Sequence, residues 1–306
     1  MVDLSVLVVT YNSAAFVGEC LDSVSATVGG HSFEVVVADN ASTDGVVELL
    51  ARSYPSARVI EMGANTGFAC ANNAALAVSS GRHVLLLNGD AVVQPGALDA
   101  MVDFLDAHPE CGAVAPRLLN TDGSDQGTAR SFPTPAAAVF GRRSPLTRLF
   151  PRNRWSSRYL SGRTEQGRSP FEVDWVSGAC VAVPRRVVAE VGGLDEGFFM
   201  HWEDADWCRR IRNAGYRVHT LPEAEVVHHE GKSRQGWPAR QVLHFHRGAY
   251  RYYTKHHTGG PWSLRRPIAA AALASRAGLI LLRDAGGRKV RRPAVAAPYP
   301  PQPAGT

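Results

Sequence analysis

The chain has 306 residues, of which 45% are apolar and 20% are charged, and its net charge is +5. This composition excludes a disordered or fibrous protein and predicts a globular one with a core of its own. Lys and Arg crowd the part after Arg142, which favours phosphate-bearing ligands or an anionic membrane surface; no nucleic-acid-binding module is recognisable. Five widely spread cysteines are typical of reduced core residues in the cytoplasm, and we find neither a signal peptide nor an apolar run long enough to span a membrane.

Apolar runs alternate with helical patterns through the first third of the chain. Strands are predicted at Leu4–Val9, at Phe33–Ala38, at Arg58–Glu61 and from His83, and a helical pattern follows each of the first three. Strands that alternate with helices indicate a parallel sheet with right-handed crossovers. We therefore predict a three-layer α/β fold with a mostly parallel central sheet.

Polar clusters stand where three of these strands end. Their side chains are Thr10, Asn12, Asp39, Asn40, Asp44, Asn88 and Asp90. Each cluster by itself could be a helix cap or a turn. Parallel strands end at one edge of a sheet, however, so three such clusters favour a shared ligand crevice.

The first strand-to-helix turn limits which ligand this crevice binds. The turn, at residues 10–15, contains no glycine, whereas a dinucleotide-binding unit needs glycines there for the backbone to approach a pyrophosphate. A complete phosphate-binding loop is also missing, since residues 231–233 match only its last three positions. A nucleotide that is read by side chains, with its diphosphate held by a metal ion, fits what remains.

The second half of the sequence begins with an irregular basic stretch at Thr134–Arg168, which suits a functional lid, a mobile segment or a solvated loop. Phe171–Val183 should pair into the sheet, and Arg185–Val191 should form a short helix. Two short strands are predicted at Tyr216–Thr220 and Ala224–His228. The last of these ends in histidines, which suit divalent-metal binding or simple packing.

An acidic cluster, Glu203, Asp204 and Asp206, opens a predicted helix directly after a run of large apolar residues. The three carboxylates could complement the helix dipole. The preceding aromatic residues instead favour a partly desolvated pocket, in which the pKa of a carboxylate rises.

The C-terminal part combines a moderately apolar helix, Pro267–Leu282, with basic residues on both sides. Such a helix could lie on an anionic membrane, or pack on the domain or on another subunit. Residues 293–306 contain five prolines and are predicted to be disordered.

Six motifs taken together resemble the family 2 glycosyltransferases, and among them the rhamnosyltransferase-like branch that builds bacterial cell-wall linkers and surface polysaccharides. The motifs are VVTYN at 8–12, VADNASTD at 37–44, NTGFA at 65–69, LLNGDA at 86–91, WEDAD at 202–206 and HHEGKS at 228–233. The likeness covers about residues 4–257 in the right order.

The resemblance implies a GT-A fold. Residues 1–116 would be its nucleotide-sugar-binding half and 117–257 its acceptor-binding, catalytic half, followed by a basic amphipathic helical extension at 258–292. It also implies an inverting, metal-dependent transferase that moves L-rhamnose from dTDP-L-rhamnose to a glycan or polyprenyl-diphosphate-linked acceptor. Such an enzyme is expected in the cytoplasm, with peripheral contact to the inner face of the plasma membrane, and a homo-oligomer is one option.

Other activities stay open at this point. A UDP-sugar such as UDP-galactofuranose is an alternative donor. A nucleotidyltransferase would share the α/β layout, but it is expected to carry a Gly- and Arg/Lys-rich loop after the first strand. A binding module without catalysis would not need both Asp90 and Asp204.

The resemblance also implies a role for individual residues. Asp204 would be the general base, and Asp90 with His228 would bind Mg²⁺ or Mn²⁺, although Asn88 stands where the family's Asp-x-Asp motif has its first Asp. The expected nucleotide-binding residues are Thr10, Tyr11, Asn12, Asp39, Asn40, Asn65, Gly67, Phe68, Asn88 and Gly89. The expected acceptor or sugar contacts are Trp175, Trp202, Glu203 and Asp206, with core packing as the other explanation for the tryptophans.

Overall fold

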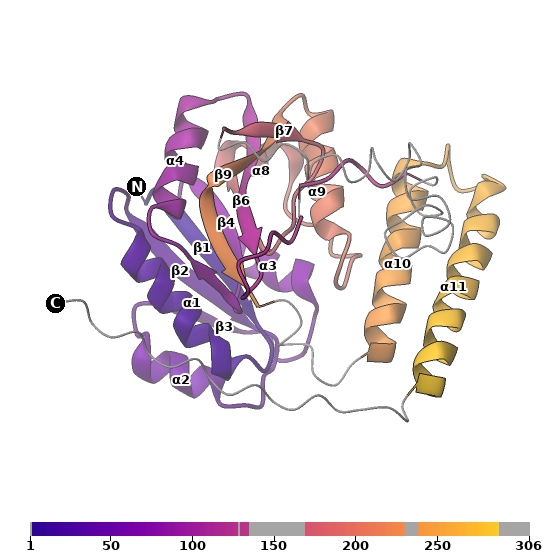
Figure 1. Ribbon diagram of the computed structural model, residues 1–306, viewed down its shortest axis with the longest axis horizontal. Coiled ribbons are helices and arrows are strands. Elements are labelled where there is room, and N and C mark those ends of the chain that lie inside the picture. The colour runs from indigo at the N-terminus through magenta and orange to yellow at the C-terminus, as the bar shows by residue number, and fades with distance from the viewer. Residues whose placement is uncertain (1, 128, 135–168, 230–237, 288–306) are drawn as a thin grey trace.

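The computed structural model describes residues 2–127, 129–134, 169–229 and 238–287. These residues form an α/β body around one nine-stranded sheet, with two long C-terminal helices standing beside it (Figure 1). Three sequence predictions fall outside the described residues: the basic stretch up to Arg168, the GKS end of the last motif, and the tail at 293–306.

The strands of the sheet are β1 (Leu4–Thr10), β2 (Phe33–Asp39), β3 (Arg58–Glu61), β4 (His83–Asn88), β5 (Ala91–Val93), β6 (Cys111–Leu119), β7 (Phe171–Val173), β8 (Cys180–Pro184) and β9 (Arg217–His228). The described helices are α1 (Ala14–Thr27), α2 (Val46–Ser53), α3 (Phe68–Val78), α4 (Ala97–Ala107), α8 (Arg185–Val191), α9 (Glu203–Asn213), α10 (Pro238–His256) and α11 (Arg265–Gly287).

The sheet has a parallel half and a mixed half, in the order β3-β2-β1-β4-β8-β6-β9-β5, with β7 paired to β9. All pairings among β3, β2, β1 and β4 are parallel, as predicted. Their register sets Thr10 opposite Asp39 and Val9 opposite Asn88, so three strand ends meet at one edge. In the other half, β8 is antiparallel to β4 and β6, and β9 is parallel to β6 but antiparallel to β5 and β7.

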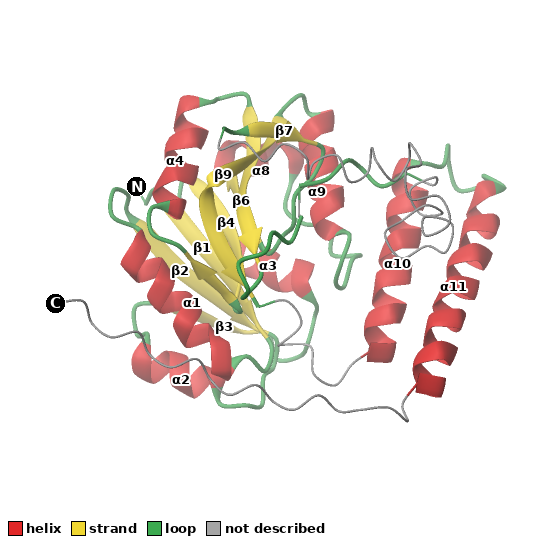
Figure 2. Ribbon diagram, in the orientation of Figure 1, coloured by secondary structure: helices red, strands yellow, loops and turns green. Residues whose placement is uncertain are grey.

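Helices cover both faces of the sheet, which confirms the three-layer prediction (Figure 2). Side chains alternate along a strand, so Val6 and Val8 of β1 pack with α1, α2 and α4, whereas Leu7 packs with α3, α8 and α9. Because β1 is buried on both faces, its sequence reads as a continuous apolar run. All five cysteines are free thiols, as expected of reduced core residues.

The structure differs from the predicted elements in the second half. The run Phe171–Val183 supplies two strands, β7 and β8, which pair with different partners. The two short strands expected between 216 and 228 form one strand, β9, which passes β6 with register shifts. The short β5 and the helix α10 were not predicted.

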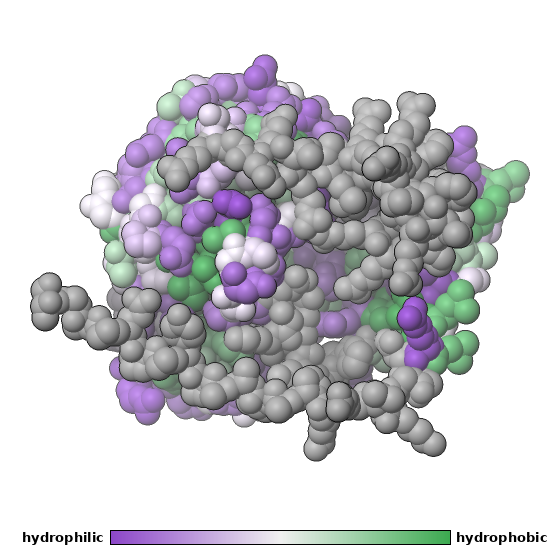
Figure 3. All heavy atoms as spheres, in the orientation of Figure 1, coloured by the Kyte–Doolittle hydropathy of each residue, from purple (hydrophilic) through white to green (hydrophobic). Residues whose placement is uncertain are grey.

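The predicted C-terminal helix is present as α11 and packs along α10. Its outer side and the preceding turn expose large apolar side chains: Trp262, Leu264, Ile268, Leu279 and Leu282. Hydrophobic residues accordingly gather at this end of the molecule in the space-filling view (Figure 3). Within the described ranges, no helix is both long and apolar enough to cross a bilayer.

Candidate active site

The ends of β1 and β2 are joined by Asp39. The hydroxyl of Thr10 donates to Asp39 Oδ1 at 2.9 Å, and the backbone N–H of Ser42 donates to Asp39 Oδ2 at 2.9 Å. The carboxylate is only 2% exposed. Asp39 therefore orders the loops that follow both strands, while its base-reading role stays a prediction.

The amide of Asn40 extends this order to the next loop. Its Nδ2 donates to the carbonyl of Gly67 at 3.3 Å, and its Oδ1 accepts from the N–H of Thr66 at 3.1 Å. Gly67 has φ +90°, and a Cβ there would lie 2.4 Å from the carbonyl oxygen of Phe199. That carbonyl also accepts from the N–H of Phe68 at 2.7 Å. Only glycine permits this approach, which ties the β2 end to the segment before α9.

Backbone strain gathers around the same crevice. Among the described residues, the non-glycine residues with positive φ are Asn12, Ala41, His201 and Trp202. The first two follow β1 and β2, and the other two lead into α9. Left-handed backbone at such residues is costly and is common at functional sites.

Asp90 and His228 lie side by side, as the metal prediction requires. The antiparallel pairing of β5 with β9 sets Ala91 opposite His228, and the carbonyl of Asp90 accepts from the N–H of His229 at 3.0 Å. Asp90 Oδ1 is 3.4 Å from His228 Nε2, both side chains are buried, and Asn88 Nδ2 is 3.1 Å from the same nitrogen.

Gln126, which the sequence did not single out, determines which nitrogen of His228 carries the proton. Gln126 Nε2 donates to the carbonyls of His228 at 2.7 Å and Leu119 at 3.3 Å, which turns its Oε1 toward His228 Nδ1 at 3.0 Å. An oxygen there can only accept, so Nδ1 carries a hydrogen, and Nε2 faces the Asn88 amide nitrogen at 3.1 Å and Asp90 Oδ1 at 3.4 Å. The only sequence signal was its place in the turn-rich loop at 120–127.

The donor set at this point fits a divalent cation. The carboxylate oxygen of Asp90 and Nε2 of His228 are both ligand types that divalent cations accept, and they lie 3.4 Å apart. Adjacent ligands of an ion with bonds of about 2.1 Å are about 3 Å apart, close to the observed separation. The hydrogen bond from the far ring nitrogen to Gln126 is the second-shell contact that metal-bound histidines usually make.

Asp204 stands in the first turn of α9, as predicted, with an oriented carboxylate. The N–H of Gly178 donates to its Oδ2 at 3.1 Å, and the N–H of Ala205 donates to its Oδ1 at 2.7 Å. Burial raises the pKa of Asp204 above its ordinary value, which these hydrogen bonds and the charge of Arg130 oppose. A Cβ at Gly178 would lie 3.5 Å from both Asp204 Cβ and the ring of Phe68, so Asp204 lies near the start of α3, which directly follows the loop at Asn65 and Gly67.

Glu203 is buried beside it and is only 5% exposed. Burial, and then the neighbouring charge of Asp204, raise the pKa of Glu203. Its Oε2 has no hydrogen-bond partner in the described part of the chain. A protonated, neutral Glu203 leaves Asp204 to carry the charge of this pair.

Arg130 is a second residue that the sequence did not single out. Its guanidinium lies over the ring of Trp175, 5.2 Å from the centroid, and its Nε donates to the carbonyl of Gly127 at 3.0 Å. Its charge lowers the pKa of Asp204. Trp175 is itself buried and donates from Nε1 to the carbonyl of Ser131, so at least one of its ring faces already has a partner.

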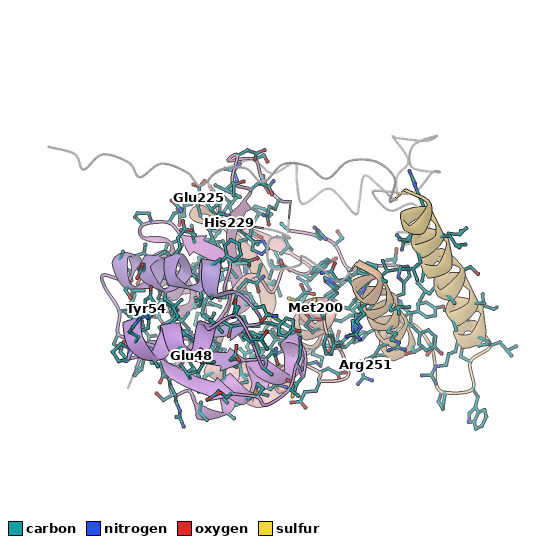
Figure 4. The ribbon with its side chains drawn as sticks, turned by 90° about the horizontal axis from the view of Figure 1, so that it is seen from below. Glu48, Tyr54, Met200, Glu225, His229 and Arg251 are labelled. Carbon is teal, nitrogen blue, oxygen red and sulfur yellow. The ribbon has the colours of Figure 1, made fainter. Side chains whose placement is uncertain are left out.

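Asp206 faces the other way, toward α10. Its carboxylate is fully buried and contacts Arg210 at 2.9 Å, Lys255 at 2.8 Å and His256 at 2.7 Å. Burial raises its pKa, but the hydrogen bonds from these three side chains lower it below the ordinary value. The structure thus places Asp206 in an ionic contact between α9 and α10, and its role in binding an acceptor hydroxyl stays a prediction. Figure 4 labels Met200, which precedes α9, and Arg251, which lies on α10.

Trp202 precedes α9 and packs against α10. Its ring lies 5.3 Å from that of Phe245 and 5.5 Å from that of Tyr252. These contacts support the packing interpretation of this tryptophan, and sugar stacking stays a prediction. Asn88 and Gly89 lie with Asp90 at the end of β4, and Tyr11 and Asn12 follow β1, as predicted.

Comparison with known proteins gives a consistent picture. Residues 5–190 match the family described as Glycosyl transferase family 2. The chain is 33% identical over 282 residues to an N-acetylglucosaminyl-diphospho-decaprenol L-rhamnosyltransferase of Mycobacterium tuberculosis, covering 87% of this chain and 90% of that protein.

Solved structures resemble the fold. A mannosyltransferase from Pyrobaculum calidifontis, in complex with GDP-Man and Mn²⁺, has a TM-score of 0.53 at 24% identity, covering 94% of this chain and 82% of that one. Residues 1–349 of TarS from S. aureus match with a TM-score of 0.54 at 16% identity, covering 89% of this chain and 78% of that one. The predicted GT-A fold is thereby confirmed.

Proposed function

Because the chain belongs to glycosyl transferase family 2, we propose that it transfers a sugar from a nucleoside diphosphate to an acceptor hydroxyl, with inversion at the anomeric carbon. One observation carries this proposal. Asp204, whose carboxylate is oriented by backbone N–H groups and whose pKa is raised by burial, lies near Phe68, directly after the loop that Asn40 ties to the strand-end crevice. Such a transfer needs a general base and a binding site for the nucleotide, and these residues could supply both.

We propose L-rhamnose from dTDP-L-rhamnose as the donor sugar, and N-acetylglucosamine on a polyprenyl diphosphate as the acceptor. The support is the mycobacterial relative, whose name states that activity and which aligns with most of this chain. The product would enter cell-wall or surface-polysaccharide synthesis.

Asp204 would act as the general base. It removes the proton of the acceptor hydroxyl while the oxygen attacks the anomeric carbon from the side opposite the leaving nucleoside diphosphate. The N–H groups of Gly178 and Ala205 hold the carboxylate in place without protonating it. A single displacement needs no nucleophilic side chain and no covalent sugar intermediate.

We propose that Asp90 and His228 hold a divalent cation, Mg²⁺ or Mn²⁺, with Gln126 fixing the histidine tautomer. Such an ion, when bound, would neutralise the charge that develops on the departing diphosphate. Support comes from the 3.4 Å approach of the two ligands and from the Mn²⁺ in the resembling mannosyltransferase.

We also propose that the protein contacts a membrane peripherally through α11. The support is the exposed apolar side of that helix and the presence of Arg265, Arg276 and Arg283 on it. The domain boundaries near 116 and 257 and a homo-oligomeric state stay predictions of the sequence.

A donor panel tests the proposed function. The purified protein is incubated with dTDP-L-rhamnose, UDP-galactofuranose and other nucleotide sugars, with membrane extract as the acceptor source. We expect acceptor-dependent release of dTDP. Release of pyrophosphate instead would indicate a nucleotidyltransferase, and the absence of release with every donor would contradict catalysis.

A further inference from the structure

A cavity of about 400 Å³ lies between the Asn65 loop and α10. Its lining includes neither the proposed general base, Asp204, nor the proposed metal ligands, Asp90 and His228. It is lined by Asn65, Phe199, Arg240, Leu243, His244 and Arg247. The last four lie at positions i, i+3, i+4 and i+7 of α10, so they share one face of this helix. The volume falls within the range of pockets that bind small organic ligands.

Positive charge defines one part of this cavity. Arg240 and Arg247 both reach His244, because the charges of both lower its pKa in addition to the effect of burial. His244 is therefore neutral between two permanent cations and stacks on Phe199, 4.2 Å between centroids. Among the described residues, no acidic side chain lines the cavity, and residues 238–283 hold eight Arg or Lys and no Asp or Glu. Paired guanidinium groups in such a field recognise phosphate oxygens.

Two further lining side chains, Phe199 and Leu243, are apolar, which a phosphate group alone does not require. Leu243 is 41% exposed and lines the cavity together with Phe199. Of the large apolar side chains that are exposed in the described ranges, all the others, Trp262 to Leu282, belong to α11 or to the turn before it. The cavity thus opens on α10, the helix that carries the apolar and basic α11.

We propose that this cavity binds the prenyl diphosphate end of a lipid-linked acceptor, with its phosphates at Arg240 and Arg247 and its first isoprene units at Phe199 and Leu243. The inference rests on the proposed function, for which it supplies a place for the part of the acceptor that does not react. A sugar on that diphosphate would extend along the Phe199–Trp202 segment toward Asp204 in the first turn of α9.

The donor also contains a diphosphate, and it is the competing source of the same chemistry. The donor's diphosphate has its own candidate partner in the cation proposed at Asp90, just before β5, and His228, the last residue of β9. An apolar wall beside the two arginines suits a prenyl chain and has no counterpart in a nucleotide sugar. We therefore assign the cavity to the acceptor.

Binding of farnesyl diphosphate to the full chain, measured by calorimetry without catalysis, tests the assignment. We expect Arg240→Gln and Arg247→Gln each to weaken binding about tenfold, because each removes charge-assisted hydrogen bonds. Leu243→Ser should weaken farnesyl diphosphate more than inorganic pyrophosphate. Arg276→Gln removes the same charge from α11 outside the cavity and should change binding less than twofold.

The outcomes separate the two sources and the two proposals. Equal weakening of dTDP binding in the Arg240 and Arg247 variants would place the donor's diphosphate in the cavity and overturn the assignment. An equal loss of farnesyl diphosphate binding in Arg276→Gln would mean that only the overall positive charge matters, and it would also overturn the assignment. If the wild type binds farnesyl diphosphate as expected but transfers no sugar to a farnesyl-diphosphate-linked N-acetylglucosamine, the proposed function fails while the cavity assignment stands.

Discussion

The two acidic positions of the site, Asp90 and Asp204, are held in place by different kinds of structure. Asp90 belongs to the sheet, where backbone pairing of β5 with β9 and the Gln126 amide fix both it and His228. Asp204 belongs to the start of α9, where two backbone N–H groups orient it and the ion pairs of Asp206 fasten the helix to α10. The metal side is thus set by the fold's central layer, whereas the base side depends on packing with the C-terminal helices.

This difference separates the expected effects of substitution. A change on the sheet side should alter metal binding and leave the base intact. A change on the helix side should alter catalysis or stability and leave metal and nucleotide binding intact.

Asp204→Asn gives the largest expected effect. The amide cannot accept the acceptor proton, so sugar transfer should fall about 10³-fold, while dTDP binding by calorimetry changes little. Glu203→Gln is the matched control, since an amide resembles the neutral acid that burial favours there, and its loss of rate should be much smaller. Loss of nucleotide binding together with transfer in Asp204→Asn would make Asp204 structural.

Asp206→Asn should instead act on stability. It leaves Arg210, Lys255 and His256 without their shared carboxylate, and we expect a loss of about 3 kcal/mol in the free energy of unfolding, measured by urea denaturation. The folded-state pKa of Asp206 is depressed, so its contribution is complete above the unfolded pKa of about 3.9 and is lost as the pH falls through the lower folded value. A variant as stable as the wild type, but with weaker acceptor binding, would restore the acceptor role.

Gln126→Leu tests the sheet side. Without the Oε1 acceptor, the proton of His228 is no longer confined to Nδ1, and Mn²⁺ affinity measured by electron paramagnetic resonance should fall about tenfold. Asp90→Ala removes a proposed metal ligand and should abolish the metal-stimulated activity. Its loss of Mn²⁺ affinity is the largest that a change at this site should give. Gln94→Leu is the control, since the side-chain amide of Gln94 donates only to the nearby carbonyl of Val92 among the described hydrogen bonds. Unchanged Mn²⁺ affinity in both Gln126→Leu and Asp90→Ala would remove the metal from this position.

Arg130→Gln should give the smallest effect, visible in the pH profile of kcat. Arg130 lowers the pKa of Asp204, so its removal raises that pKa and moves the acidic limb of the profile to higher pH. Arg117→Gln, in which a surface arginine paired with Asp125 and Glu225 is changed, should leave the limb in place. A limb that moves to lower pH, or not at all, would contradict the proposed contact between Arg130 and the base.

The sequence predicted the parallel half of the sheet well, because strands buried on both faces, such as β1 and β4, read as unbroken apolar runs that end in polar residues. It did not predict β5, whose three residues are too few for a pattern, or α10, where His and Arg interrupt the apolar face. The approach of Asn88 to His228 joins residues 140 positions apart and depends on strand pairing. The role of Gln126 depends on two carbonyls brought together by folding, which no local pattern encodes.

The ion pairs of Asp206 limit which substitutions could change the acceptor that the protein uses. Since Asp206 lies two residues after the proposed base and is clamped to Lys255 and His256, any displacement of α10 is transmitted directly to the turn that aims Asp204. The helix that would bind the lipid and the carboxylate that would deprotonate the acceptor sugar are thus mechanically coupled through Asp206. Substitutions on α10 that adapt the chain to a different lipid carrier would therefore have to keep the position of Asp204 unchanged.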